Sequence, residues 1–321
     1  MFRYVTLHIM STKQMSELNR KKKFAANFSV ISNSGLVVLK LLVGVMSGAV
    51  SIIAEAIHSG IDLLAAIIAR YSVVKSAEPA DEKHHFGHGK VESVSALIEG
   101  LLIFFAAYLI IHEAYSKIVH GIKIDIIGAG IGVMFISTVA NILISRYLFR
   151  IAKETKSDAL DADAWHLKTD VYTSLGVFVA LILIHFLKGV IPHVEYLDPT
   201  IAIATAIWIS FAAFQITKDA ILNLVDTKIS EEEEAIVKKA ILENSDTFID
   251  FHKLRSRRSG FYTYIDLHLV VSRGLSVDKA HKLTHHIEKD IKKLLRNTDI
   301  MFHLEPCNSK CKRCKIRCTK S

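Results

Sequence analysis

Two histidine–aspartate pairs with the same spacing are the residues of this chain best suited to chemistry. His58 and Asp62 lie four residues apart in one apolar run, and His166 and Asp170 repeat that spacing in a later one. Residues four apart share a face of a helix, so each pair presents an imidazole beside a carboxylate. Two such helices facing each other would supply two nitrogens and two oxygens, a donor set that suits tetrahedral Zn²⁺.

An alternative remains open, in which the histidine and aspartate of each pair neutralise each other and only hold helices together. Ionisable side chains at membrane depth are costly and usually mark an ion pathway. Because the same pair occurs twice, we favour a metal site over the purely structural role.

The elements that must position these pairs are membrane helices. The chain has 321 residues, is 51% hydrophobic and has a mean hydropathy of +0.32, which is too apolar for an ordinary soluble enzyme. A helix needs about 20 apolar residues to cross a bilayer. Runs of that kind predict six spans, at 24–46, 47–70, 91–113, 124–146, 165–187 and 197–218. No signal-peptide pattern precedes them.

The placement of Lys and Arg predicts the orientation of these spans. The segments before the first span, between the second and third, and between the fourth and fifth are rich in both residues, whereas the opposite loops are poor in them. We therefore expect both termini in the cytoplasm and the protein in the cell (inner) membrane. Most of the net charge of +8 comes from the last sixteen residues, so a nucleic-acid partner has little electrostatic support.

After Thr217 the pattern changes to that of a small soluble domain. Ser230 suits a helix N-cap and four glutamates follow it, which favours a helix N-terminus. Two strand-forming runs with a turn at Ser259 and Gly260 come next, then an amphipathic helix and a last strand. The ranges are 230–244, 248–260, 261–272, 276–297 and 299–306. The order αββαβ predicts an α+β sandwich.

These patterns divide the chain into four parts. We expect an N-terminal cytoplasmic segment, a six-helix transmembrane domain, a cytoplasmic αββαβ domain and a basic, cysteine-rich tail. Their residues are 1–23, 24–218, 227–306 and 307–321.

The chain resembles the cation diffusion facilitator family of divalent-metal/proton antiporters, and within it the bacterial Fe/Zn-type zinc exporters. The resemblance covers about residues 24–306 and rests on the two HxxxD pairs, the loop ADEKHHFGHGK at 80–90 and the histidine-bearing αββαβ domain. It implies six transmembrane helices, a metallochaperone-like cytoplasmic domain and a homodimer. It also implies a transport site at His58, Asp62, His166 and Asp170.

One ligand departs from the Fe/Zn-type pattern. Those members usually have aspartate at the position of His58, and histidine there is similar to the zinc-selective subgroup. The metal therefore stays open between Zn²⁺ alone and a broader set with Cd²⁺, Fe²⁺ or Co²⁺. Two imidazoles and two carboxylates are softer and fewer than the oxygen-rich shells of Mg²⁺ or Ca²⁺, which favours zinc.

The resemblance also implies secondary sites. A second, more exposed zinc site would lie at Asp81, His84 and His88, where a plain solvated loop is the alternative. A binuclear zinc site at the dimer interface would use His252, His268, His281, His303 and Glu305. Lys90 and Asp226 match a charge interlock near the membrane surface, although both could be solvated surface residues.

The four cysteines lie in the tail, where the resemblance gives no guidance. Cys307, Cys311, Cys314 and Cys318 have a near-helical spacing among six cations, which favour thiolates. In a reducing cytoplasm, capture of Zn²⁺ or Cd²⁺ is favoured over structural disulfides. A disordered basic tail attracted to anionic lipid is an equally weighted alternative.

The sequence has none of the HExxH, GxSxG, Walker or Gly-rich phosphate motifs of hydrolytic enzymes. We expect a secondary transporter, not an enzyme, that exports Zn²⁺ in exchange for protons and needs no organic cofactor. Metal binding requires deprotonated ligands, so protons can compete with the metal. A membrane-embedded metal sensor or assembly protein without turnover is the alternative, and the direction of transport rests on the resemblance alone.

Overall fold

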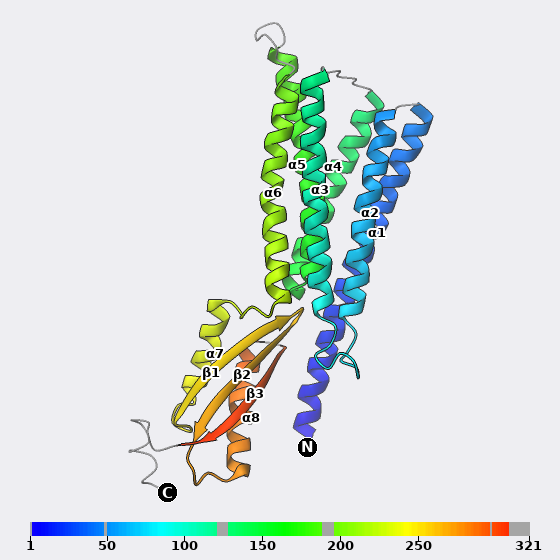
Figure 1. The fold of residues 1–321 in the computed structure, drawn as a ribbon. Coiled ribbons are helices and arrows are strands. Elements are labelled where there is room, and N and C mark those ends of the chain that lie inside the picture. Colours follow the sequence, from blue (N-terminus) through cyan, green and yellow to red (C-terminus); the bar gives the residue numbers. More distant parts are fainter. Residues whose placement is uncertain (1, 48–49, 121–127, 188–195, 296, 308–321) are drawn as a thin grey trace. The chain divides into compact units, whose positions relative to one another are not determined.

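A computed structural model describes residues 2–47, 50–120, 128–187, 196–295 and 297–307. The chain divides into two compact units, Met1–Ile221 and Leu222–Ser321. The first is helical and the second combines helices with a sheet (Figure 1). Each unit is described by itself below.

The first unit contains six long helices. They are α1 (Phe2–Ser47), α2 (Val50–Ser76), α3 (Lys90–His120), α4 (Gly128–Thr155), α5 (Asp158–Leu187) and α6 (Leu197–Leu224). Over the described residues, α1, α2, α3, α4 and α6 contain stretches long and apolar enough to cross a membrane. The remaining helix, α5, carries His166 and Asp170 together with several other acids.

Most of these helices extend beyond the apolar runs that predicted them. The largest difference is at α1, which begins at Phe2, whereas its apolar run begins at residue 24. At their far ends, α2 reaches Ser76 and α4 reaches Thr155. An apolar run marks what a bilayer can hold, but helical hydrogen bonding continues into polar sequence where nothing interrupts it.

Small residues let the helices approach closely. One buried cluster joins alanines of α1, α4 and α5, among them Ala25, Ala152 and Ala164. At the contact between α3 and α6, a Cβ added to Gly100 would lie 2.4 Å from Thr217 Oγ1, so only glycine fits there. Such contacts are typical of helices in lipid, where packing replaces the hydrophobic effect.

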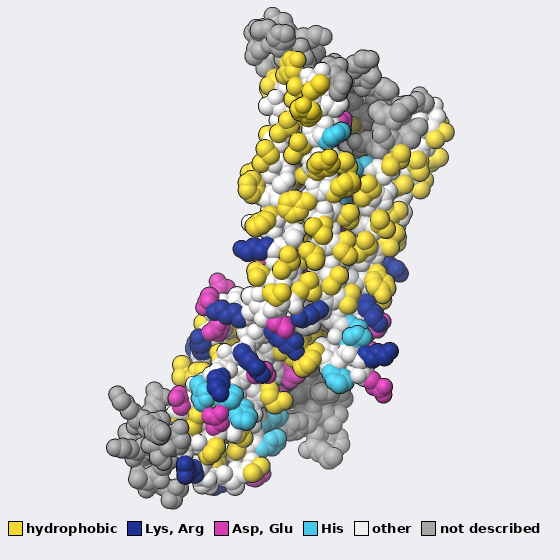
Figure 2. Space-filling view, in the orientation of Figure 1, with side chains coloured by type: hydrophobic (Ala, Val, Ile, Leu, Met, Phe, Trp, Pro, Cys, Tyr) yellow, Lys and Arg dark blue, Asp and Glu magenta, His cyan; other side chains and the backbone are white. Residues whose placement is uncertain are grey.

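Large apolar side chains cover the outside of the helical unit, as the face drawn in Figure 2 shows. Phe105, Phe135, Phe186 and Phe211 are among those that are more than half exposed. An apolar surface of this extent is expected where the surroundings are lipid.

The second unit follows the predicted order αββαβ. Its elements are α7 (Glu231–Glu243), β1 (Asp250–Ser259), β2 (Tyr262–Val271), α8 (Val277–Leu294) and β3 (Thr298–Pro306). Ser230 is the N-cap of α7, as predicted, and its Oγ accepts a hydrogen bond from Glu233 N at 3.2 Å. The predicted turn is also present, with Gly260 at φ +54°.

The three strands form one sheet in the order β1–β2–β3, with β1 antiparallel and β3 parallel to β2. Side chains alternate between the two faces of a strand. Leu267 and Leu269 of β2 are buried in a core that also contains Ile287 and Ile291 of α8. His268, which lies between the two leucines, therefore points to the opposite face of the sheet.

Candidate functional site

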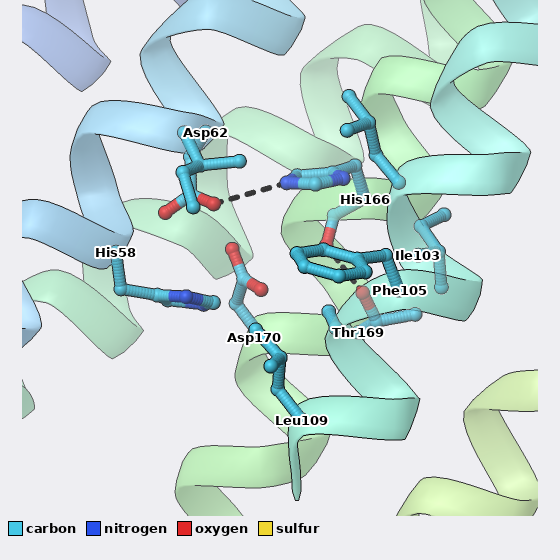
Figure 3. A pocket seen from close by; sticks show the side chains of 11 residues that line it. His58, Asp62, Ile103, Phe105, Leu109, His166, Thr169 and Asp170 are labelled. Carbon is cyan, nitrogen blue, oxygen red and sulfur yellow. Dashed lines mark hydrogen bonds and ion pairs between the residues drawn. The ribbon is translucent and has the colours of Figure 1, made fainter.

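The four predicted transport ligands lie together inside the helical unit (Figure 3). His58 and Asp62 come from α2, and His166 and Asp170 from α5. Ligand atoms of His58, Asp62 and Asp170 all lie within 4.8 Å of one another. His166 Nε2 lies 3.0 Å from Asp62 Oδ1, and both residues are buried, with exposures of 4% and 7%. The arrangement has the donors and the spacing for one divalent cation.

A small pocket joins these ligands to α3 (Figure 3). Ile103, Phe105 and Leu109 contribute apolar walls on that side. Polar ligands against an apolar wall exclude competing water, which strengthens the attraction between a cation and the carboxylates. The neighbouring helix thus gives the candidate site its low-dielectric surroundings.

Sequence reasoning missed a buried lysine next to this site. Lys40 of α1 is 7% exposed, and its Nζ donates to Ser59 Oγ at 2.7 Å. Its charge also acts on the Asp62 carboxylate. A lysine inside the apolar run LVVLKLLVGV was the signal that could have identified it, because such a charge is costly unless it serves a purpose.

A second buried polar cluster centres on Glu92, at the start of α3. This carboxylate is fully buried and pairs with Lys22 of α1. The hydroxyls of Ser76 and Ser157 also donate to it. Four segments of the helical unit meet at this group. Removing either charge would leave the other buried and uncompensated, which is strongly destabilising.

The loop residues Asp81, His84 and His88 also converge. Their ligand atoms lie within 4.8 Å of one another. Asp81 Oδ1 lies 3.0 Å from His84 Nδ1, and Asp81 Oδ2 lies 3.4 Å from His88 Nε2. The segment is a series of turns, and Gly87 at φ +75° helps to close it. Backbone hydrogen bonds from Lys83 and His84 lower the pKa of Asp81, although partial burial opposes them and is the largest single effect.

In the cytoplasmic unit, three histidines form a row across one face of the sheet. The register pairs His252 with His268 and His268 with His303. Glu305 lies beside them, with Oε1 2.6 Å from His268 Nδ1 and Oε2 3.3 Å from His252 Nε2. The hydrogen bond from His268 is the main reason that the pKa of Glu305 is lowered. All four side chains keep partial solvent exposure.

The fifth residue of the predicted cytoplasmic set does not join this row within one chain. His281 is exposed on α8, where its ring stacks on His285 with centroids 6.2 Å apart. Helix α8 packs against the sheet face that carries Leu267 and Leu269. The sheet therefore separates His281 from the histidine row, a relation that matching by sequence position could not reveal.

The two residues of the predicted interlock belong to different units. Lys90 begins α3 in the helical unit, and Asp226 belongs to the cytoplasmic unit. Within its own unit, Asp226 Oδ2 lies 3.5 Å from Arg257 Nη1. The bridge between Lys90 and Asp226 stays a prediction.

The cysteine tail lies almost entirely outside the described residues, which include Cys307 but not Cys311, Cys314 or Cys318. Cys307 is buried in a cluster with Ile249 and is disulfide-bonded. It therefore differs from the free thiolate that we expected at this position. A sulfur held in a disulfide carries no thiolate and cannot bind a metal as one.

Comparisons with known proteins identify the family. Residues 27–225 match the family model of the cation efflux transmembrane domain, and residues 229–307 match that of the cytoplasmic domain of cation efflux proteins. The uncharacterized transporter sll1263 of Synechocystis sp. is 32% identical over 268 residues, which cover 84% of this chain and 85% of the relative. The cation-efflux pump FieF of Pectobacterium atrosepticum is 29% identical over 279 residues, covering 85% and 89%.

The chain belongs to the cation diffusion facilitator family. It is an integral membrane protein that transports divalent cations out of a compartment, and it is a transporter and not an enzyme. The predicted fold class, helical membrane spans followed by a cytoplasmic α+β domain, is confirmed. Membership in the family does not by itself identify the metal, the counter-ion or the ligand residues.

Proposed function

We propose that this cation diffusion facilitator exports Zn²⁺ from the cytoplasm in exchange for protons. The observation that carries the proposal is the cluster of His58, Asp62, His166 and Asp170 on two adjacent membrane helices, in which Asp62 and His166 are buried. Its two imidazoles and two carboxylates match the ligand number and softness that zinc prefers. Cd²⁺, Fe²⁺ and Co²⁺ are the competitors that such a site would also admit.

Proton exchange follows from the chemistry of the ligands. Imidazole and carboxylate bind metal only after losing their protons. In this proposal, protons reach the site from the outer side and displace the metal, and cytoplasmic metal then displaces those protons. Four protein ligands leave no open position on zinc for hydrolysis, which is consistent with transport of an unchanged ion.

The other clusters take supporting roles in the proposal. Asp81, His84 and His88 would bind zinc in the loop before α3. His252, His268, His303 and Glu305 offer a donor set that fits zinc, and His281 would complete a binuclear site in a homodimer. The family model of a cytoplasmic domain supports that assembly. Both termini would then be cytoplasmic and the bilayer would be that of the cell (inner) membrane.

The test is metal uptake into inverted membrane vesicles that carry an imposed pH gradient. Zn²⁺, Cd²⁺, Fe²⁺ and Mn²⁺ are supplied separately, and vesicles without the protein are the control. We expect zinc to enter fastest, with uptake that depends on an acidic interior and stops when a protonophore collapses the gradient. Uptake that ignores the gradient would contradict proton exchange.

A membrane-embedded metal sensor remains the competing function, because the same ligands could bind metal without turnover. Purified protein in proteoliposomes separates the two. A sensor would bind zinc at a fixed stoichiometry and leave the amount inside the vesicles unchanged, whereas a transporter accumulates it over many turnovers.

A further inference from the structure

Two buried carboxyl groups of the helical unit belong to none of the candidate ligand sets. Glu99 lies on α3 with an exposure of 0%, and Asp163 lies on α5 with an exposure of 1%. Glu99 Oε2 and Asp163 Oδ2 have no hydrogen-bond partner among the described residues. A buried carboxylate with an unsatisfied oxygen is costly, so we expect the two groups together to hold at least one proton or cation.

Both groups lie one helical turn from the transport site. On α3, Ile103 lines the pocket and follows Glu99 by about 6 Å along the helix axis. On α5, His166 follows Asp163 by about 4.5 Å. Residues three, four and seven apart share a helix face, so Glu99 faces the same side as the pocket residues Ile103 and Ala106.

The two helices also start at the same end of the unit. The Ser157 hydroxyl donates to Glu92, and the Ser93 hydroxyl donates to Asp158 Oδ2 at 2.7 Å. These contacts join the first residues of α3 to those of α5. Glu99 and Asp163 therefore lie between that common end and the transport site, and the proposed orientation makes this end cytoplasmic.

The surroundings of Glu99 offer hydroxyls and other acids. Ser95 Oγ donates to Glu99 Oε1 at 3.4 Å, and Thr217 of α6 packs against the neighbouring Gly100. From α5, the charges of Asp163 and Asp161 both act on Glu99. Asp219 of α6 acts in turn on Asp161. Asp161 and Asp219 are exposed, whereas Glu99 and Asp163 are buried. Two buried carboxyl groups that act on each other do not readily both ionise, so Glu99 and Asp163 would share a proton.

A proton fits this pair better than a divalent cation does. Among the described residues, the groups of three or more ligands that converge do not include Glu99 or Asp163. Ser29 contacts Asp163 by a hydrogen bond, which adds only a neutral hydroxyl. Zinc takes four ligands and magnesium or calcium six or more, whereas a proton needs one oxygen and a partner to share it.

We propose that Glu99, with Asp163 as its partner, is a proton-carrying group between the transport site and the cytoplasmic end of the bundle. This inference rests on the proposed zinc/proton exchange. When cytoplasmic zinc binds, a ligand loses its proton and the Glu99 carboxylate accepts it. The new O–H bond then breaks, the proton passes to water at the cytoplasmic end, and Glu99 returns to the carboxylate form for the next cycle.

The test compares wild type with Glu99→Gln in proteoliposomes that contain a pH-sensitive dye and a zinc-sensitive dye. Glutamine keeps the size and hydrogen bonding of the side chain but cannot ionise. We expect zinc-driven proton movement to fall about a hundredfold, in line with the usual contribution of a positioned acid or base. Zinc binding measured at equilibrium should stay within a factor of about two, because the ligands are intact.

Glu113→Gln is the matched control, because Glu113 lies on the same helix with its side chain 71% exposed. It should behave as wild type. Glu99→Asp guards against misfolding of the glutamine variant. Aspartate keeps the ionisable group, so this variant should couple zinc to protons more slowly than wild type but faster than Glu99→Gln.

The outcomes separate this inference from the proposed function. If wild type moves zinc without protons, the proposed exchange fails and the inference falls with it. If wild type couples the two and Glu99→Gln couples them equally well, only the role of Glu99 is wrong. A glutamine variant that binds fewer zinc ions but keeps proton coupling would identify the pair as a metal site and would also overturn the inference. If Glu99→Gln does not fold, full coupling in Glu99→Asp together with an unchanged dependence on pH would overturn it.

Discussion

The membrane unit and the cytoplasmic unit both gather histidines and carboxylates, but they hold them in opposite surroundings. Asp62 and His166 are buried among helices, whereas His252, His268 and Glu305 lie on a sheet face that is still partly open to water. Burial makes charge expensive, so the membrane cluster depends on a bound cation or on protons. The exposed histidine row stays hydrated without metal. Metal bound there can therefore stabilise the fold and need not be transported.

The two regions also build their clusters differently. In the membrane unit, the four-residue spacing places His58 beside Asp62 on α2 and His166 beside Asp170 on α5. The contact between the two helices then brings the two pairs together. In the cytoplasmic unit, the residues are far apart in sequence and meet because the strand register aligns them. Residues that share a helix face can be recognised from their spacing in the sequence, whereas a site on a sheet depends on which strands pair.

The largest effect should come from removing one buried carboxylate of the membrane cluster. Asp62→Asn keeps the shape of the side chain but deletes the charge that a cation needs in low dielectric. We expect zinc transport in proteoliposomes to fall by at least about a hundredfold, since even outer-shell partners of a metal site are worth about 10- to 100-fold.

Glu113→Gln is the control for a lost acid on a membrane helix, and it should transport normally. Size-exclusion chromatography should show that Asp62→Asn still assembles as wild type does. Zinc flux close to wild type in this variant would mean that the buried cluster is not the transport site.

The second prediction concerns stability in the exposed cluster. A fragment of residues 227–306 should melt at a higher temperature when zinc is added, because a ligand that binds only the folded state stabilises it. At a zinc concentration of about 100 times Kd the gain is about 2.7 kcal/mol. His268→Gln should remove most of this gain, as measured by calorimetry with zinc and with chelator.

The matched control for that variant is His286→Gln, because His286 lies on α8 near Asp290 and away from the row. It should keep the zinc-dependent gain. Equal melting temperatures of the wild-type fragment with zinc and with chelator would contradict a stabilising site on this sheet face.

The third prediction concerns the effect of ligand type on metal choice. His58→Asp replaces an imidazole by a harder oxygen ligand, so the site should accept a broader set of metals. We expect the preference for Zn²⁺ over Fe²⁺ or Co²⁺ to fall by about tenfold, which corresponds to about 1.4 kcal/mol. Competition between metals in vesicle uptake measures this ratio, and an unchanged ratio would exclude position 58 as the selectivity determinant.

The smallest effect that we expect is the contribution of Glu305 to the stability of the metal-free fragment. The hydrogen bond from His268 holds the pKa of Glu305 below its usual range. A group with a lowered folded-state pKa stabilises the fold above its unfolded pKa, about 4.3, and this contribution is lost as the pH falls through the folded value. The metal-free fragment should therefore keep this contribution down to about pH 5 and lose it progressively at lower pH.

Melting temperatures of the wild-type fragment and Glu305→Gln between pH 7 and pH 3 measure this contribution. Their difference should be constant down to about pH 5 and shrink below it. Glu243→Gln, at the end of α7, is the control and should track wild type. A difference that grows on acidification would show that the hydrogen bond does not favour the ionised carboxylate.

Much of the architecture could be predicted from local pattern. Apolar runs indicated the six long helices, and the Ser230 cap, the turn at Gly260 and the αββαβ order all follow from short-range chemistry. The ends of the helices could not be predicted in the same way. Hydropathy reports transfer into lipid, whereas helix ends depend on hydrogen bonding and capping, which continue outside the bilayer.

Other features depended on contacts that sequence position does not express. His281 matched the pattern of a ligand, but the sheet lies between it and the histidine row of its own chain. Cys307 had the spacing of a tail thiolate, yet it is buried beside Ile249. Lys40 and Glu99 are single charges in apolar runs. Only the structure shows that Lys40 is buried beside Ser59 and that Glu99 is buried with one oxygen that has no hydrogen-bond partner among the described residues.

The sequence by itself determined the membrane class, the two HxxxD pairs and the order of the cytoplasmic elements, because helical periodicity and hydropathy act over a few residues. Only the tertiary structure decided which His and carboxylate groups meet, which remain in water and which lose their partners. Those outcomes depend on the packing of α3 against α5 and on the register of β2 with its neighbours. Contacts between segments far apart in the chain set the local dielectric, and the dielectric sets what a charged side chain can do.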